Sequence, residues 1–379
     1  MSAPQGQRIA ILRERATGET RVSATPETVR KLVALGATVA VEQGAGLAAS
    51  LSDEDYRVAG AEVSQAETVL AGADIVLGVQ GPDPALLSGT KPGAWVVATF
   101  DPFSQRTRVD AYAVAGLEAL AMEFMPRITR AQSMDVLSSQ SNLAGYKAVI
   151  AAADIYGRAF PMMMTAAGTI SAAKCFVMGV GVAGLQAIAT ARRLGAQVSA
   201  TDVRSATKEQ ILSLGAKPIF VENVAGIEGE GSGGYATEMS EEYQKAQAEL
   251  VSSHIAKQDI VITTALIPGR AAPRLISDAQ IATMKPGSVI FDLAAPQGGN
   301  VEGTVADQVV ERHGVKIIGY SNTPANLPAD ASALYARNLF NFLSAFWDKD
   351  QGKPVLDEEI GDAIRLTRDG SVVNARLLG

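Results

Sequence analysis

Residues 175–202 read CFVMGVGVAGLQAIATARRLGAQVSATD, and this stretch decides the fold class of the chain. It opens with an apolar run of strand length and passes into the pattern G-x-G-x-x-G, formed by Gly179, Gly181 and Gly184. A helical pattern and a second strand-like run follow, and that run ends in Asp202. A strand, a glycine-rich turn, a helix, a strand and an acid in this order are typical of a βαβ unit that binds a dinucleotide.

Each residue type in this motif has a physical role, although an ordinary glycine-rich turn is the alternative. Gly179 permits a tight turn, Gly181 lets the backbone approach a pyrophosphate, and Gly184 lets the helix pack closely on the strand. Free N–H groups at the helix N-terminus favour phosphate. The Asp202 carboxylate would bind a ribose 2′-hydroxyl and repel a 2′-phosphate, which favours NAD(H) over NADP(H). Arg204 is the discordant residue, because an arginine there can bind a 2′-phosphate.

The composition indicates a soluble protein of two domains. A chain of 379 residues is long enough for two domains, and its net charge of −7 argues against nucleic acid or anionic lipid as a partner. The single cysteine, Cys175, excludes an intrachain disulfide, and we expect it in the core. The N-terminus lacks the apolar core of a signal peptide. The uncharged stretches 159–173 and 175–191 contain proline, polar residues or the glycine motif, so neither predicts a membrane span.

Alternating strand and helix patterns predict the architecture. Residues 8–100 and 174–320 each alternate short apolar runs with helical spacing, which is typical of parallel sheets with helices on both faces. The expected strands are 8–12, 38–42, 74–79, 94–99, 174–178, 197–202, 217–221, 259–264, 288–293 and 315–320. The expected helices include 27–35, 53–59 and 331–347, with Pro26 and Ser52 as start signals for the first two.

We therefore predict the α/β class, with two Rossmann-like doubly wound parallel-sheet domains and a cleft between them. The helical pattern 331–347 follows the last strand of the nucleotide-binding unit, so we expect the chain to return to its first domain. The N-terminal α/β domain would then be discontinuous, comprising 1–138 and 325–379. The NAD-binding Rossmann domain, 139–324, would be inserted into it.

A glycine-rich segment, 226–234, is unlike an ordinary scaffold element. It precedes Tyr235. The composition alone suits either a disordered surface loop or a lid whose aromatic tip closes over a ligand.

A second unusual segment, 127–146, combines many hydrogen-bonding side chains ahead of a helix expected from about Asn142. Capping of that helix explains one or two of its serines, Ser138, Ser139 and Ser141. Capping does not explain three other polar residues, Arg127, Gln132 and Asp135.

This second segment carries a family resemblance. Residues 125–146 read MPRITRAQSMDVLSSQSNLAGY. Further characteristic segments are FPMMMTAAGT (160–169), ATDVR (200–204), GGYA (233–236) and TTALIPG (263–269). Together with the glycine motif, they resemble the NAD(H)-binding component, domain I, of the proton-translocating nicotinamide nucleotide transhydrogenases. The resemblance extends over nearly the whole chain.

The resemblance implies a divided enzyme. In that family domain I binds NAD(H), a separate domain binds NADP(H), and a membrane domain couples hydride transfer to proton translocation. The present chain would be the soluble alpha-subunit component, a homodimer that is inactive alone. Its partners would be an NADP(H)-binding domain and a membrane-embedded domain on separate chains, so we expect a cytoplasmic protein peripheral to the inner membrane.

The resemblance also implies site residues. The nicotinamide would lie near Arg127, Gln132, Asp135 and Ser138. Tyr235 would belong to a mobile loop, and Asp202 would bind the adenosine ribose. The other NAD contacts that the resemblance implies are Gly179, Gly181, Val182, Gly184, Val203, Arg204, Gly234, Gln247 and Leu266.

The residue types suit that reaction. Hydride transfer between two nicotinamides moves no proton, so no general acid or base is needed, but the two C4 atoms must approach within about 3–3.5 Å. Arginine, glutamine, aspartate and serine can hold a carboxamide and a ribose without proton chemistry. The two histidines, His254 and His313, fall outside the motifs, and we expect surface or structural roles for them.

Two rival functions share features of this pattern. An alanine dehydrogenase has the same architecture but needs acid–base groups, and that family has a lysine and a histidine after its third and fourth strands. Here Gln80 and Asp101 follow those strands, and their role stays open. A non-catalytic NAD-binding regulator would carry the same cofactor motif, but it would not need the polar segment Arg127–Ser138 to orient a nicotinamide.

Overall fold

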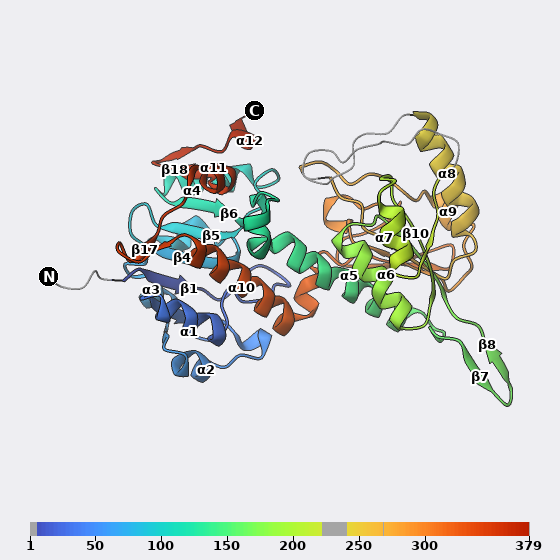
Figure 1. Ribbon diagram of the computed structural model, residues 1–379, viewed down its shortest axis with the longest axis horizontal. Helices are drawn as coiled ribbons and strands as arrows, with labels where there is room; N and C mark the ends of the chain where they lie inside the picture. Colours follow the sequence, from blue (N-terminus) through green and yellow to red (C-terminus); the bar gives the residue numbers. More distant parts are fainter. Residues whose placement is uncertain (1–5, 222–240, 268, 379) are drawn as a thin grey trace. The chain divides into compact units, whose positions relative to one another are not determined.

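The computed structural model describes residues 6–221, 241–267 and 269–378. The chain divides into two compact units, drawn in Figure 1. Unit 1 comprises Met1–Gln140 and Ala325–Gly379, and unit 2 comprises Ser141–Pro324. Helix α5 (Val136–Ile155) includes the first crossing from unit 1 to unit 2.

Within its described residues, unit 1 contains a six-stranded parallel sheet in the order β3-β2-β1-β4-β5-β6. The sheet strands are β1 (Arg8–Ile11), β2 (Thr38–Glu42), β3 (Glu62–Ser64), β4 (Ile75–Gln80), β5 (Trp95–Thr99) and β6 (Glu118–Ala121). The helices are α1 (Pro26–Ala34), α2 (Asp53–Val58), α3 (Ala66–Leu70), α4 (Arg106–Val114), α10 (Pro328–Ala345), α11 (Glu358–Ile364) and α12 (Ala375–Leu378). This strand order is that of a doubly wound fold.

Short elements complete unit 1. The 3₁₀ helices are η1 (Leu47–Ala49), η2 (Pro84–Leu87), η3 (Met122–Phe124) and η4 (Thr129–Met134). Two small antiparallel ladders pair β16 (Trp347–Asp348) with β17 (Lys353–Pro354), and β18 (Thr367–Arg368) with β19 (Ser371–Val372).

The predicted helix start signals are confirmed. Pro26 begins α1, and the preceding Thr25 forms a capping box with Thr28. Ser52 caps α2 and forms the same reciprocal pair with Asp55. Each cap satisfies backbone N–H groups that a helix N-terminus leaves without partners.

Unit 2 contains, within the described ranges, a seven-stranded sheet in the order β11-β10-β9-β12-β13-β15-β14. The strands are β9 (Lys174–Met178), β10 (Gln197–Thr201), β11 (Lys217–Pro218), β12 (Ile260–Thr263), β13 (Val289–Asp292), β14 (Val309–Arg312) and β15 (Val315–Ile318). The helices of this unit are α6 (Val182–Arg193), α7 (Thr207–Ser213), α8 (Glu241–Ile255) and α9 (Asp278–Ile281), with η5 (Ala295–Gln297) and η6 (Thr323–Asn326). The edge strand β14 runs antiparallel to β15.

The predicted α/β class with two doubly wound sheets is confirmed, and Cys175 is fully buried as expected. Sequence patterns missed the short strands β3, β6 and β14. They also missed a hairpin of β7 (Met163–Thr165) and β8 (Gly168–Ile170), whose residues are all exposed and which projects from unit 2 in Figure 1. No helix among the described residues is both long and apolar enough to span a membrane.

Candidate functional site

The glycine turn between β9 and α6 is built by close backbone packing. Gly179 has a φ of +98°, a conformation that disfavours side chains, and a Cβ there would lie 2.5 Å from Thr264 Oγ1. A Cβ on Gly184 would lie 1.9 Å from the Gly179 carbonyl oxygen. The first and third glycines of the motif are therefore required by the turn itself.

The second glycine faces open space. A Cβ on Gly181 would meet no atom within 4 Å, so packing within the described chain does not explain the glycine. Gly181 is the N-cap of α6 and supplies no side-chain cap, and the next residue, Val182, is 40% exposed. No side chain among the described residues accepts from the first amides of α6, which suits a phosphate group.

Asp202 lies beside this turn and is already hydrogen-bonded. Its Oδ2 accepts from Val180 N at 2.7 Å and from Arg204 Nη2 at 3.1 Å. Its Oδ1 accepts from Arg204 N at 2.9 Å and from Arg204 Nε at 3.0 Å. The side chain of Asp202 is only 6% exposed, and that of Arg204 is 16% exposed. The intervening Val203 is half-buried. Arg204 therefore neutralises the acid that was expected to select the nucleotide.

The loop after β12 completes this side of unit 2. Thr264 donates from Oγ1 to the Gly179 carbonyl at 3.0 Å, which ties the loop to the glycine turn. Asn300 holds the next residue, because it accepts from Ala265 N at 3.0 Å and donates to Ala265 O at 2.8 Å. Leu266 follows and is 38% exposed. The structure thus brings Leu266 to the same edge of the sheet as the glycine motif.

Thr264 and Asn300 are positions that sequence reasoning did not single out as functional. Thr264 stands in a segment that was recognised only by resemblance. Asn300 follows the glycine pair 298–299, and nothing in its local pattern shows that it contacts a loop more than thirty residues away.

The polar segment of unit 1 corrects one expectation. Asp135 does cap α5, because its Oδ1 accepts from Ser138 N at 2.9 Å and its Oδ2 accepts from Ser138 Oγ at 2.5 Å. The helix accordingly begins at Val136 and not near Asn142. Capping therefore explains Asp135, whereas Arg127 and Gln132 have exposed side chains for which no helix cap accounts. Gln132 lies on η4, and Arg127 lies between η3 and η4.

Two predicted residues, Gly234 and Tyr235, lie outside the described residues. Gln247 is half-buried on α8. The two histidines both have local partners. His254 lies 2.8 Å from Ser199 Oγ and packs its ring edge-on to Phe176, and His313 pairs with Asp278 at 2.9 Å.

Gln80 belongs to a buried network at the carboxyl end of the unit 1 sheet. Its amide donates to Glu19 Oε2 at 2.9 Å, and Glu19 binds the Arg21 guanidinium through both oxygens. Burial raises the pKa of Glu19, but the hydrogen bonds and charge of Arg21, with the Gln80 bond, outweigh it and hold the pKa below its ordinary value. Arg21 also donates to Gln140 at 2.9 Å. Gln80 is thus held by the chain's own side chains.

Two further carboxyl groups in this unit are unusually basic. Burial raises the pKa of Glu14 to about 7, although Glu14 accepts a hydrogen bond from Val79 N at 2.6 Å. Burial likewise raises the pKa of Glu123 to about 7. Glu123 Oε1 accepts from the backbone of Phe100 and Asp101, while its buried Oε2 has no hydrogen-bond partner among the described residues. Asp101 itself is exposed and has a φ of +49°.

Comparison with known proteins now defines the class. Family models described as alanine dehydrogenase/PNT, N-terminal domain and C-terminal domain, match residues 10–144 and 148–375. The chain belongs to the alanine dehydrogenase/PNT family.

Within that family, the chain is more similar to transhydrogenases than to alanine dehydrogenases. The first component of the NAD(P) transhydrogenase alpha subunit of Rhodospirillum rubrum is 52% identical over 381 residues, covering 98% of this chain and 99% of that protein. A crystal structure of transhydrogenase from Sinorhizobium meliloti has a TM-score of 0.88 at 53% identity, covering 96% of this chain and 99% of that one. Alanine dehydrogenase 1 of Staphylococcus aureus is 29% identical, covering 93% of this chain and 90% of that protein. The resemblance inferred from the sequence is confirmed.

Proposed function

We propose that this chain is the NAD(H)-binding subunit of an NAD(P) transhydrogenase, and that it presents NADH for hydride transfer to NADP⁺ bound on a separate chain. The observation that carries the proposal is full-length similarity to transhydrogenase alpha subunits together with the geometry of the glycine turn. The open space at the Cβ position of Gly181 would admit a dinucleotide pyrophosphate, and the first N–H groups of α6, which the Gly181 N-cap does not satisfy, could donate to it. When bound, NADH supplies the hydride.

The residues of unit 2 would bind the adenosine half. The α6 amides would donate to the pyrophosphate, and Asp202 would accept from the ribose. Because each Asp202 oxygen already accepts two hydrogen bonds, a ribose hydroxyl would have to displace one donor of the Arg204 guanidinium. Arg204 would thus be displaced by NADH, and would not act as a ligand for a 2′-phosphate.

The residues of unit 1 would position the nicotinamide. Arg127 and Gln132 are the leading candidates, since both side chains are exposed and can donate to a carboxamide. Asp135 and Ser138 would act chiefly by beginning α5, although the Ser138 hydroxyl keeps acceptor capacity. None of these residues would need to transfer a proton, because a hydride passes directly between two nicotinamides.

The assembly follows from the same similarity. We propose that the chain acts as a homodimer in the cytoplasm, at the inner membrane, through an NADP(H)-binding chain and a membrane-embedded chain that couples the transfer to proton translocation. An alanine dehydrogenase activity is not favoured, because positions 80 and 101 hold glutamine and aspartate, not lysine or histidine, and the Gln80 amide donates a hydrogen bond to Glu19.

Reconstitution tests the proposal. The chain alone should bind NADH and oxidise no alanine. Addition of an NADP(H)-binding transhydrogenase domain should produce hydride transfer, assayed with an acetylpyridine analogue of NAD⁺. Gln132→Asn and Arg127→Ala should slow transfer more than they weaken NADH binding. Tight NADH binding with no transfer in any such mixture would favour a regulator, and robust alanine oxidation would overturn the proposal.

A further inference from the structure

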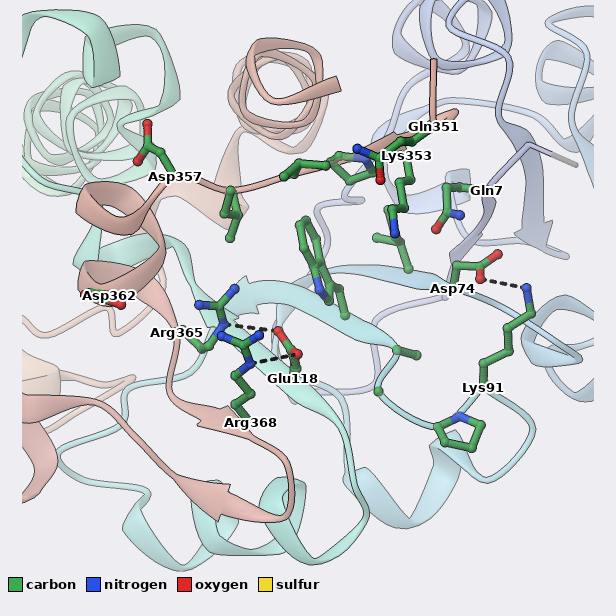
Figure 2. Close-up of a pocket in the computed structure, with 18 of the residues that line it drawn as sticks. Gln7, Asp74, Lys91, Glu118, Gln351, Lys353, Asp357, Asp362, Arg365 and Arg368 are labelled. Carbon is green, nitrogen blue, oxygen red and sulfur yellow. Dashed lines mark hydrogen bonds and ion pairs between the residues drawn. The ribbon is translucent and has the colours of Figure 1, made fainter. Parts of the chain in front are cut away.

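Unit 1 contains a cavity of about 710 Å³ that no part of the proposed function uses. It lies at the amino ends of β4, β5 and β6, whereas Gln80 and Asp101 lie at the carboxyl ends of β4 and β5. The C-terminal residues 351–368 line its other wall (Figure 2). A cavity of this size is within the ordinary range for small-molecule sites.

Two arginines in this cavity share one carboxylate. Arg365 Nε lies 3.1 Å from Glu118 Oε2, and Arg368 Nε lies 3.8 Å from Glu118 Oε1, as Figure 2 shows. Among the described residues Arg368 also pairs with Asp369, at 3.6 Å, whose side chain is 90% exposed. Neither Arg368 contact is a hydrogen bond, because both exceed 3.5 Å. The pair of guanidiniums therefore has donors available for one further acidic group.

A planar apolar surface lies in the same cavity. Trp95, the first residue of β5, lines it and is only partly buried. Pro354 and Leu356 line the cavity as well, on the C-terminal segment. An indole that lines a cavity offers a favourable surface for an aromatic ring.

The acids of the cavity limit the charge of the ligand. Asp74 pairs with Lys91 at 2.6 Å, and Asp357 pairs with Arg130 at 2.5 Å. Glu358 and Asp362, on α11, have no ion pair among the described residues. Their negative charges would repel a ligand that carries several acidic groups. The positive charges of Arg365 and Arg368 would offset that repulsion for a ligand with a single acidic group.

We propose that this cavity binds a small ligand in which a planar ring carries one acidic group. The ring lies against Trp95, and its carboxylate or phosphate binds between Arg365 and Arg368. Lys353, drawn beside Gln351 and Gln7 in Figure 2, adds a further positive charge to the lining of the cavity.

Tryptophan fluorescence reports on this site directly. The chain has two tryptophans, so Trp347→Phe leaves Trp95 as the sole tryptophan, and excitation near the red edge of tryptophan absorption with detection of tryptophan emission separates it from tyrosine and NADH. In the full-length Trp347→Phe protein, saturated with NADH to occupy the unit 2 site, AMP or nicotinate should quench the emission in a saturable way. AMP tests a phosphate and nicotinate tests a carboxylate, whereas adenosine and nicotinamide lack the acid and should bind at least about tenfold more weakly.

The arginine variant decides the outcome. Arg368→Ala should weaken the binding of the quenching ligand about tenfold or more. The substitution should leave the fold intact, because the ion pairs that it removes are long, at 3.8 Å and 3.6 Å, and contribute little to stability. The matched control is Arg337→Ala, which removes an exposed arginine of the same unit that pairs with Glu27 outside the cavity, and should leave the affinity unchanged. Absence of quenching by both acidic probes, equal quenching by their neutral analogues, or an unaltered affinity in Arg368→Ala would each overturn the proposal.

Discussion

Two alanine substitutions in the glycine motif should affect different properties, one the affinity for NADH and the other the stability of the fold. Gly181→Ala places a methyl group in open space, so the fold should accept it while the dinucleotide pyrophosphate should not. Gly184→Ala places a methyl group 1.9 Å from the Gly179 carbonyl oxygen, so the fold itself should resist it. The two variants make the same chemical change three residues apart.

The magnitudes follow from those contacts. Gly181 has a φ of −80° and a ψ of −165°, which alanine adopts freely, and losing glycine at an N-cap costs under about 1 kcal/mol. An overpacked Gly184→Ala costs about 1–3 kcal/mol, at the upper end because the opposing atom is backbone. For a domain of the size of unit 2, that loss lowers Tm by roughly 2–12 °C. The added methyl group of Gly181→Ala should obstruct the pyrophosphate and weaken the binding of NADH at least about tenfold, or by about 1.4 kcal/mol.

Thermal unfolding without ligand and NADH titration by fluorescence at 25 °C separate the two effects. Gly181→Ala should lose affinity with little loss of Tm, and Gly184→Ala should lose Tm. Wild-type NADH affinity in Gly181→Ala would refute the path of the pyrophosphate over this residue. An unchanged Tm in Gly184→Ala would refute the close approach of α6 to the turn.

Three further outcomes are expected. Arg204→Ala frees acceptor positions on Asp202 and leaves the Asp202 charge without its counter-charge, so NADH affinity should hold or rise while NADPH, whose 2′-phosphate that charge repels, should bind more weakly than to wild type. A loss of NADH affinity would contradict the displacement of Arg204. Asp135→Ala removes the α5 cap and should cost about 0.5–2 kcal/mol in urea unfolding, more than Ser138→Ala, which keeps the backbone bond. Glu123 holds its proton up to a pKa of about 7, against an ordinary value of 4.5, so the folded chain binds more protons than the unfolded chain between these values and loses stability as pH rises through them. Glu123→Gln, which cannot ionise, should therefore lose less Tm than wild type between pH 5 and pH 8, and equal losses would count against the buried acid.

Local patterns predicted much of the fold because their causes are local. The positive φ of Gly179 is a local backbone requirement, and the start signals at Pro26 and Ser52 act within one helical turn. The long apolar runs of the central strands are buried on both faces, which makes them readable from composition.

Patterns failed where an element depends on its neighbours. The strands β3, β6 and β14 have only three or four residues each, and they are strands because an adjacent strand pairs with them. The sequence pattern gave no sign that Asp135 caps a helix, but Asp135 lies one residue before α5 and accepts a hydrogen bond from Ser138 N. The sequence pattern starts that helix six residues late, so this role could not be read from the sequence.

The sequence by itself determined the α/β class, the dinucleotide motif and the family, because each rests on spacing within short segments. Tertiary structure alone decided that Arg204 neutralises Asp202, that Asn300 holds the loop before Leu266, and that Trp95 and Arg368 line one cavity. These residues are between two and more than two hundred positions apart in the sequence, and they meet only because the chain folds. A hydrogen bond or ion pair depends on distances of about 3 Å, and only packing of the whole unit sets such distances.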